Sequence, residues 1–428
     1  MRIGIAGAGV AGLTLAWLID GTHDSVVIEA RDDIGGNLRS RRFVDAGGTA
    51  RVIDLGVYSV PLEAFTLFER LTRNLGLSQD DWVTTPATYT IAEAGRELPL
   101  FRGPLTAPGD DKTAESGPST ADAQQAIATL VREAADWIAR DLDWAVPLRD
   151  VVEPWSLLAT MKESVVYALP SSLWACDLPQ ASTLSARATA AVFASDAPAG
   201  TTPTTQTLRE GMQDVARRLA AQLNTADLRP GADLRHIRRV GDRLAMIDSR
   251  GDTHTVDAIV LAVPADAAAE ALRDLPGADM ARRALSAYRY ADIAHGVHLD
   301  PCFLCPDPLH RSTTNITVDG AWALSTVRRR FDDGGEAFVS RLDHRESLPR
   351  HLLARAGFRT LLPLPAMFAA QRRLRELQGR GDLYFAGHVM TQVPTQESAV
   401  VTAVDVARAL APDSPRLTTL TPLRKATP

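Results

Sequence analysis

Three glycines near the start of the chain have the spacing of a phosphate-binding turn. Gly7, Gly9 and Gly12 occur in the segment MRIGIAGAGVAGLTLAWLID as G-x-G-x-x-G. Where this pattern joins a strand to a helix, the glycines allow a tight turn, the close approach of a pyrophosphate and close helix packing. The N–H groups at the helix start then face the phosphate charge. The spacing therefore predicts a dinucleotide site, with plain packing of small residues as the alternative.

The neighbouring segments predict the elements that position this turn. Residues 1–6 are apolar and predict a strand, and residues 13–19 predict a helix. A second apolar strand over 26–28 ends at Glu29. A carboxylate at the tip of the second strand suits the two hydroxyls of a ribose. The alternative for Glu29 is an exposed acid at a strand end.

A second diglycine, Gly35-Gly36, follows Glu29, and the pair Asp54-x-Gly56 comes later. With the first turn, these residues resemble the flavoprotein superfamily of monoamine oxidase, phytoene desaturase and protoporphyrinogen oxidase. In that family an acid, a short spacer and GG, usually followed by arginine, wrap FAD. Asn37 stands in the usual place of the arginine. The resemblance then leaves a phosphate or ribityl contact to Arg39 or to backbone groups.

The far end of the chain carries the second part of the resemblance. The segment LYFAGHVMTQVPTQESAVVTAVDVARAL predicts a strand over 383–386, a turn at Gly387 and a helix from about Glu397. It is similar to the closing strand and helix of the family, which lie beneath the flavin. The N–H groups of Ser398 and Ala399 are expected to stabilise negative charge near the flavin C2 carbonyl.

A third patch, residues 205–268, predicts a helix, a hairpin and a buried strand that stops at Pro264. It resembles the adenine side of the family, with Leu234 near the adenine edge. Together the three patches imply noncovalent FAD, because no cysteine lies within 387–399. The residues implied to contact FAD are Gly7, Gly9, Ala11, Gly12, Glu29, Ala30, Arg31, Gly35, Gly36, Asn37, Leu38, Arg39, Leu55, Gly56, Val57, Tyr58, Leu234, Val263, Gly387, His388, Glu397, Ser398 and Ala399.

The length and the alternation of strands and helices predict an α/β protein of two domains. A chain of 428 residues, 45% hydrophobic, is long enough for two full cores. We expect a discontinuous Rossmann-like FAD-binding domain and an α+β substrate domain built from two inserts. The predicted bounds are 1–60, 205–268 and 375–428 for FAD binding, 61–204 and 269–374 for substrate, and 102–122 for a mobile loop within the first insert.

Charge and hydropathy exclude several classes of partner. The net charge of −6 argues against a nucleic-acid partner. No apolar run is long enough to predict a transmembrane segment. The first strand begins at residue 2 and leaves no room for a cleaved signal, so we expect a cytoplasmic protein.

The pair Cys302-x-x-Cys305 does not predict a metal or redox site. Prolines bracket the pair, whereas a thioredoxin-type pair begins a helix. Cys176 is the one further cysteine, too few for a four-cysteine zinc site. We therefore expect no metal.

The sequence leaves the catalytic residues open. Many amine oxidases use a lysine on a strand of the second insert, but none of the three lysines lies within 269–374. The candidates are His388, which follows the Gly387 turn, Tyr58, which follows Asp54-x-Gly56, and His295, near the matching strand. For each, a packing or backbone role is the alternative.

The resemblance implies an FAD-dependent oxidoreductase that takes a hydride from a C–H bond of a small or lipophilic metabolite. The expected type is an amine or amino-acid oxidase or a desaturase, with reoxidation by dioxygen or another acceptor. The stretches DLGVYSVPLEAFTLFERL and YFAGHVMTQ also resemble bacterial polyunsaturated fatty acid isomerase, so a redox-neutral double-bond isomerase of an unsaturated fatty acid or polyene is one alternative. A non-catalytic flavin-binding protein and a nicotinamide-only enzyme are the others.

Overall fold

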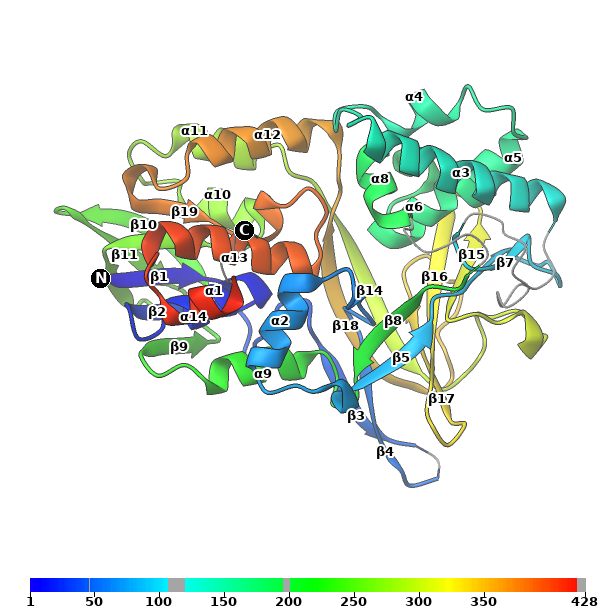
Figure 1. The fold of residues 1–428 in the computed structure, drawn as a ribbon, viewed down its shortest axis with the longest axis horizontal. Coiled ribbons are helices and arrows are strands. Elements are labelled where there is room, and N and C mark those ends of the chain that lie inside the picture. The colour runs from blue at the N-terminus through cyan, green and yellow to red at the C-terminus, as the bar shows by residue number, and fades with distance from the viewer. Residues whose placement is uncertain (46, 107–119, 195–200, 422–428) are drawn as a thin grey trace, which may run out of the picture.

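The computed structural model describes residues 1–45, 47–106, 120–194 and 201–421, which form two lobes (Figure 1). The first lobe is built on a parallel five-stranded sheet in the order β19-β13-β1-β2-β9. Its strands are β1 (Arg2–Ala6), β2 (Asp24–Glu29), β9 (Ala226–Pro230), β13 (Ala258–Leu261) and β19 (Leu383–Phe385). Stretches far apart in the sequence therefore meet in one sheet, which confirms the predicted α/β class.

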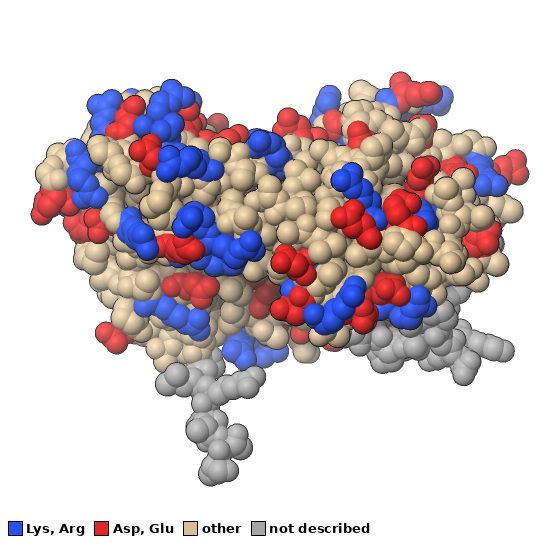
Figure 2. Space-filling model, turned by 90° about the horizontal axis from the view of Figure 1, so that it is seen from above, with Lys and Arg blue, Asp and Glu red and all other residues tan. Residues whose placement is uncertain are grey.

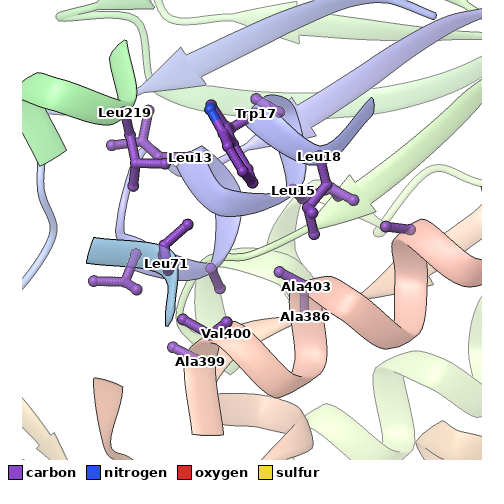
Figure 3. Close-up of a cluster of buried hydrophobic side chains, with 14 of the residues drawn as sticks. Leu13, Leu15, Trp17, Leu18, Leu71, Leu219, Ala386, Ala399, Val400 and Ala403 are labelled. Atoms are coloured by element: carbon purple, nitrogen blue, oxygen red, sulfur yellow. The ribbon is translucent and has the colours of Figure 1, made fainter. Parts of the chain in front are cut away.

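Helix α1 (Val10–Ile19) is buried along its whole length and forms the centre of one layer. Its residues are almost all apolar, which is the pattern of a helix enclosed on every side. It packs against α13 (Gln396–Leu410), α9 (Gln213–Ala221) and α2 (Thr66–Asn74), as Figure 3 shows for Leu13, Leu71, Leu219 and Val400. The short helix α14 (Pro415–Leu420) completes this layer.

The opposite face of the parallel sheet carries a small antiparallel sheet and three helices. The strands are β10 (Leu234–Val240), β11 (Arg243–Asp248) and β12 (Thr253–Val256), and the helices are α10 (Ala265–Ala271), α11 (Asp279–Leu285) and α12 (Pro365–Glu376). Leu285 and Phe368 share one apolar core with Ile259 and Leu261 of the sheet. The second predicted insert therefore gives α11 and α12 to the first lobe and does not lie wholly in the second.

The second lobe is built on a mixed sheet in the order β18-β14-β17-β16-β15-β6-β7, in which only β15 and β6 run parallel. Its strands are β6 (Tyr89–Glu93), β7 (Phe101–Gly103), β14 (Tyr290–His298), β15 (Thr314–Asp319), β16 (Trp322–Arg330), β17 (Glu336–Arg341) and β18 (Leu352–Leu361). Two ribbons lie beside it, β3 (Ser40–Val44) with β4 (Ala50–Asp54) and β5 (Trp82–Pro86) with β8 (Thr204–Leu208).

Helices cover one end of this sheet (Figure 1). They are α3 (Ala121–Ala139), α4 (Leu148–Val152), α5 (Ala159–Met161), a π-helical turn (Lys162–Tyr167), α6 (Ala168–Trp174), α7 (Leu178–Ala181) and α8 (Ala186–Phe193). Of the loop predicted over 102–122, residues 107–119 lie outside the described residues. The predicted range overlaps the end of β7 on one side and the first residues of α3 on the other.

Basic and acidic side chains intermingle on the face shown in Figure 2. This matches a composition of 46 Lys and Arg against 52 Asp and Glu. Among the described residues, no helix combines the length and the apolar character that a membrane crossing needs.

Candidate functional site

The glycine turn joins β1 to α1 as predicted, and its three glycines have different reasons to be glycine. Gly7 has φ +100° and a Cβ there would lie 2.5 Å from the Ala262 carbonyl oxygen. A Cβ on Gly12 would lie 1.9 Å from the Gly7 carbonyl oxygen. Both positions are therefore glycine because the fold leaves no room for a side chain.

Gly9 is different, because the fold does not require glycine there. It is the N-cap of α1 with φ −80°, which any residue adopts, and it makes no side-chain cap. A Cβ on Gly9 would meet only Gly36 Cα, at 3.7 Å. Glycine is among the residues that an N-cap favours, together with Ser, Thr, Asp and Asn. The bare glycine leaves open the space in front of the α1 N-terminus, where a pyrophosphate binds in dinucleotide sites.

The second diglycine lies directly against this turn. Gly35 pairs with Gly9 in a parallel bridge, and its N–H donates to the Ala8 carbonyl at 2.8 Å. Gly35 and Gly36 have φ +116° and +62°, and a Cβ on Gly36 would lie 3.0 Å from Gly9 Cα. The structure thus brings the two predicted glycine segments together.

Two guanidinium groups converge on the same carbonyl beside this space. Arg31 Nη2 and Arg39 Nε donate to the Gly36 oxygen at 2.9 and 3.2 Å. Burial and the charge of Arg31 lower the pKa of Arg39 to about 10. The two cations lie beside the glycine turn, and the Glu29 carboxylate, 3.7 Å from Arg31 Nε, offsets part of their charge.

Glu29 ends β2, and its side chain is 11% exposed. Its Oε2 accepts from the Ala8 N–H at 2.8 Å and its Oε1 from the Arg31 N–H at 3.1 Å. The carboxylate therefore holds the glycine turn to the tip of β2. A carboxylate offers about four lone-pair sites, so it can accept further hydrogen bonds from a ribose.

Leu234, at the start of β10, lies beside this end of β2, because the Ala232 N–H donates to the Glu29 carbonyl at 2.8 Å. Val263 packs against the turn, with Cγ1 3.2 Å from where a Gly7 Cβ would be. Val263 therefore lies beside the turn, and Leu234 lies near the Glu29 end of β2.

The other predicted residues of this region differ in burial and in contacts. Leu38 is fully buried, and Ala30 is exposed. A Cβ on Gly56 would lie 2.2 Å from the Asn37 carbonyl oxygen, so these two backbones touch. The Leu55 carbonyl accepts from His295 Nδ1 at 2.7 Å, and Val57 packs against the core of the first lobe.

Gly387, which follows β19 near the end of the chain, also lies beside the start of α1. Gly387 has φ +74°, and a Cβ there would lie 3.4 Å from Cβ of Ala11 in the first turn of α1. The imidazole of His388 is half-buried and has no hydrogen-bond partner among the described residues. Burial lowers the pKa of His388 to about 4, so the ring is neutral rather than titrating near pH 6–7.

At the start of α13, the free N–H groups are not those that the sequence predicted. Thr395 caps the helix, and the N–H groups of Ser398 and Ala399 both donate to Thr395, at 3.0 Å each. The groups without an intrahelical acceptor are those of Gln396 and Glu397, the first two helical residues. A Thr cap satisfies the third helical N–H and leaves the first two open. Thr395 in the sequence could therefore have identified Gln396 as a residue with a free N–H.

The Glu397 carboxylate also has a different role. It accepts from the backbone N–H groups of Leu67 and Phe68, at 3.0 and 2.7 Å, and so caps the start of α2. Glu397 therefore offers its backbone N–H, and not its carboxylate, at the α13 N-terminus.

Two of the candidate catalytic residues lie together. The hydroxyl of Tyr58 lies 2.8 Å from Nδ1 and 3.1 Å from Nε2 of His295. The Leu55 carbonyl can only accept, so Nδ1 carries the proton and Nε2 accepts from Tyr58. Burial lowers the pKa of His295 to about 4 and raises the pKa of Tyr58, so both side chains are neutral.

Asp54 was quoted in the sequence pattern without a role, and it ties several elements together. The carboxylate accepts from the Ser40 hydroxyl, from the Met212 N–H at 2.8 Å and from Thr207 Oγ1 at 3.2 Å. Burial raises its pKa to about 6. Its signal in the sequence was the Asp-x-Gly spacing at a strand end.

The cysteines are free thiols. Cys302 is exposed and Cys305 is buried, and burial raises the pKa of both thiols. Among the described residues, no group of three or more His, Cys, Asp or Glu side chains is placed to hold a metal.

Comparisons with known proteins were made for both the sequence and the fold. The model of the family described as flavin containing amine oxidoreductase matches residues 10–304. No curated protein sequence matches the chain. The fold is similar to that of the CLA-producing fatty acid isomerase of P. acnes, with 14% identity and a TM-score of 0.65 over 96% of this chain and 98% of that one.

Two amine oxidases have the same fold. Cyclohexylamine oxidase from Brevibacterium oxydans IH-35A has 16% identity and a TM-score of 0.66 over 96% of this chain and 99% of that one. Putrescine oxidase bound to putrescine has 16% identity and a TM-score of 0.63 over the same shares, 96% and 99%. At these identities the structures establish the shared fold.

Proposed function

Because the chain belongs to the flavin containing amine oxidoreductase family, and is a flavin-dependent oxidoreductase, we propose that its cofactor is noncovalent FAD and that it removes a hydride from a C–H bond of a small or lipophilic metabolite. The observation that carries the dinucleotide assignment is the space at Gly9. The fold does not require glycine there, yet no side chain fills the space between the α1 N-terminus and Gly36.

The residues around this space fit an FAD dinucleotide. Gly9, Gly36 and the guanidinium groups of Arg31 and Arg39 would hold the pyrophosphate, and Glu29 would accept from the ribose hydroxyls. When bound, FAD supplies the acceptor for the hydride. No cysteine lies between Gly387 and Ala399, which supports noncovalent binding.

The start of α13 supplies the electrostatic part of the site. The free N–H groups of Gln396 and Glu397 and the positive end of the helix dipole favour negative charge in front of them. His388 lies on the same segment as a neutral imidazole that is free to donate or accept one hydrogen bond.

Tyr58 and His295 are the groups that can move a proton. Tyr58 is a neutral phenol that donates to Nε2 of His295, and Nδ1 of His295 is held by the Leu55 carbonyl. Removing a hydride from an amine or alcohol carbon requires a heteroatom proton to leave. We propose that the Tyr58 hydroxyl accepts that proton as it passes its own to Nε2.

A redox-neutral double-bond isomerase is the second candidate. The stretches around Tyr58 and His388 resemble fatty acid isomerase, and no lysine lies within 269–374, where many amine oxidases use one. The same site would then take the hydride and return it at another carbon, with no external electron acceptor.

One experiment separates these functions. The purified holoprotein is mixed without oxygen with pooled amines, amino acids or unsaturated fatty acids, and the visible flavin bands are recorded. Bleaching by one pool and recovery in air support an oxidase, with dioxygen as acceptor. A shifted double bond without lasting bleaching supports the isomerase. Bound flavin that responds to no pool indicates a non-catalytic flavin protein, and a colourless protein that stays colourless with added FAD contradicts the proposal.

A further inference from the structure

A small cavity of mixed polar and apolar lining lies beside Tyr58. Its lining residues come from β4, the β5–β8 ribbon and β16, which Figure 1 labels. It has a volume of about 50 Å³, room for one or two small polar groups rather than for a whole metabolite. Its polar lining residues include Asp54, Tyr58, Thr205, Thr207, Thr313 and Arg329.

Three arginines, Arg328, Arg329 and Arg330, line this cavity, and Arg329 differs from the other two in its contacts. It is the middle one of three consecutive arginines at the end of β16. Arg328 and Arg330 both pair with Glu336, at 3.0 and 3.7 Å. Arg329 has no hydrogen bond or ion pair within the described part of the chain, and the nearest ring, that of Phe331, is 6.0 Å from its guanidinium carbon. Burial lowers the pKa of Arg329, although the nearby acids oppose this shift.

The acids near Arg329 are already engaged by other groups. The Asp54 carboxylate accepts from Ser40, Met212 and Thr207, and Asp332 pairs with Arg209 at 3.0 Å. Neither acid lies within ion-pair distance of Arg329. A partly buried guanidinium with threonine hydroxyls around it and no partner is a site for an anion of matching shape, and a carboxylate forms two parallel hydrogen bonds with it.

The cavity is joined to the candidate catalytic pair, because Tyr58 lines it and also contacts His295. In the sheet, Arg329 pairs with Ala337 and His295 pairs with Arg341, four residues further along β17. That separation is about 13 Å along the strand, and β16 and β14 are two strands apart. A carboxylate at Arg329 would thus lie several bonds from a carbon that reacts near His295.

We propose that Arg329 binds the carboxylate of the substrate, and that this substrate is an acid whose carboxylate lies far from the reacting carbon. This inference rests on the proposed function and names its substrate class. An α-amino acid fits less well, because its ammonium group would lie beside the guanidinium of Arg329.

The test measures binding by calorimetry, with hexanoate, hexanamide and norleucine as probes of equal chain length. We expect hexanoate to bind the holoprotein at least about tenfold more tightly than the other two, because a charge-assisted pair exceeds a neutral one by that factor. Arg329→Gln should abolish this preference, and Arg329→Lys should keep part of it. Arg355→Gln is the matched control, because Arg355 is exposed and lies opposite Gly296 on the other face of the sheet.

Equal binding of hexanoate and hexanamide, or a preference that survives in a folded Arg329→Gln variant, would overturn the inference. Tightest binding of norleucine would overturn it as well, in favour of an α-amino acid. Calorimetry measures binding without using the flavin absorbance, so its result does not depend on whether the flavin assignment is correct. A colourless protein with a hexanoate preference would remove the proposed function and keep the anion site.

Discussion

The Tyr58 hydroxyl lies 2.8 Å from Nδ1 and 3.1 Å from Nε2 of His295, although 237 residues separate the two in the chain. The pair joins the turn after β4 to the middle of β14, which is where the two lobes meet. Because Leu55 holds Nδ1, the Tyr58–Nε2 hydrogen bond is the one that can pass a proton.

Tyr58→Phe should therefore slow flavin reduction by substrate about a hundredfold, the lower end of the usual loss of a general acid or base. Flavin content should stay at the wild-type level, because the hydroxyl faces His295 and not the glycine turn. Anaerobic stopped-flow absorbance gives the rate and the visible spectrum gives the content. An unchanged rate would remove Tyr58 from the proton path.

Gly9→Val should leave the protein folded and colourless. A Cβ at Gly9 meets no protein atom closer than 3.7 Å, but a larger side chain would fill the space assigned to the pyrophosphate. Gly12→Ala is the contrasting variant, because its Cβ would lie 1.9 Å from the Gly7 oxygen and should destabilise the fold itself. Thermal unfolding and flavin absorbance distinguish the two effects, and a yellow Gly9→Val protein would contradict the site.

Glu29→Ala should lower stability and FAD affinity together. The carboxylate accepts from the Ala8 and Arg31 N–H groups, and loss of charge-assisted hydrogen bonds costs about 1–3 kcal/mol. Glu29→Gln keeps an acceptor for Ala8 and should recover most of the stability, while FAD affinity stays reduced. Equilibrium dialysis with FAD and urea unfolding separate the two readouts. Unchanged FAD affinity in both variants would show that Glu29 does not bind the ribose.

Glu397→Ala should cost about 1–2 kcal/mol of stability, a typical loss for an N-cap, because it removes the cap of α2. FAD affinity should change little, since the substitution keeps the backbone N–H of residue 397. Glu397→Gln, which retains one amide oxygen as acceptor, should lose less stability. A large loss of FAD from a stable Glu397→Ala protein would give the carboxylate a direct role in binding.

Asp54 should make stability fall as pH rises from about 4 to 6. Burial raises its folded-state pKa from 3.8 to about 6, so in this range the folded protein holds a proton that the unfolded chain has released. The difference corresponds to about 3 kcal/mol.

Buried His295, His298 and His388 act in the opposite direction, because their lowered pKa values make stability rise between about pH 4 and 6.5. The comparison of wild type with Asp54→Asn isolates the aspartate. In urea unfolding at pH 4 and pH 6.5, the wild type should lose about 2 kcal/mol relative to the variant as pH rises, because part of the full effect lies outside this range. A constant difference would mean that folding leaves the pKa of Asp54 unchanged.

The sequence by itself determined the features whose requirements are local. The strand, glycine turn and helix over 1–19 follow from backbone sterics at Gly7 and Gly12 and from an apolar helix that must be buried. The helix Ala121–Ala139 is likewise a local feature, because its apolar residues recur with the helical period.

The tertiary structure decided which groups are free and which are engaged. The Glu397 carboxylate caps α2, and the Ser398 and Ala399 N–H groups are taken by Thr395, so the open donors at α13 are those of Gln396 and Glu397. Three adjacent arginines look alike in the sequence, but only Arg329 faces the cavity beside Tyr58 without a partner among the described residues. The contact from Glu397 to Leu67 joins residues 330 apart in the chain, and the pairing of β16 with β17 decides which of the three arginines meet Glu336. Neither follows from local sequence, because only the packed structure sets which side chains find partners.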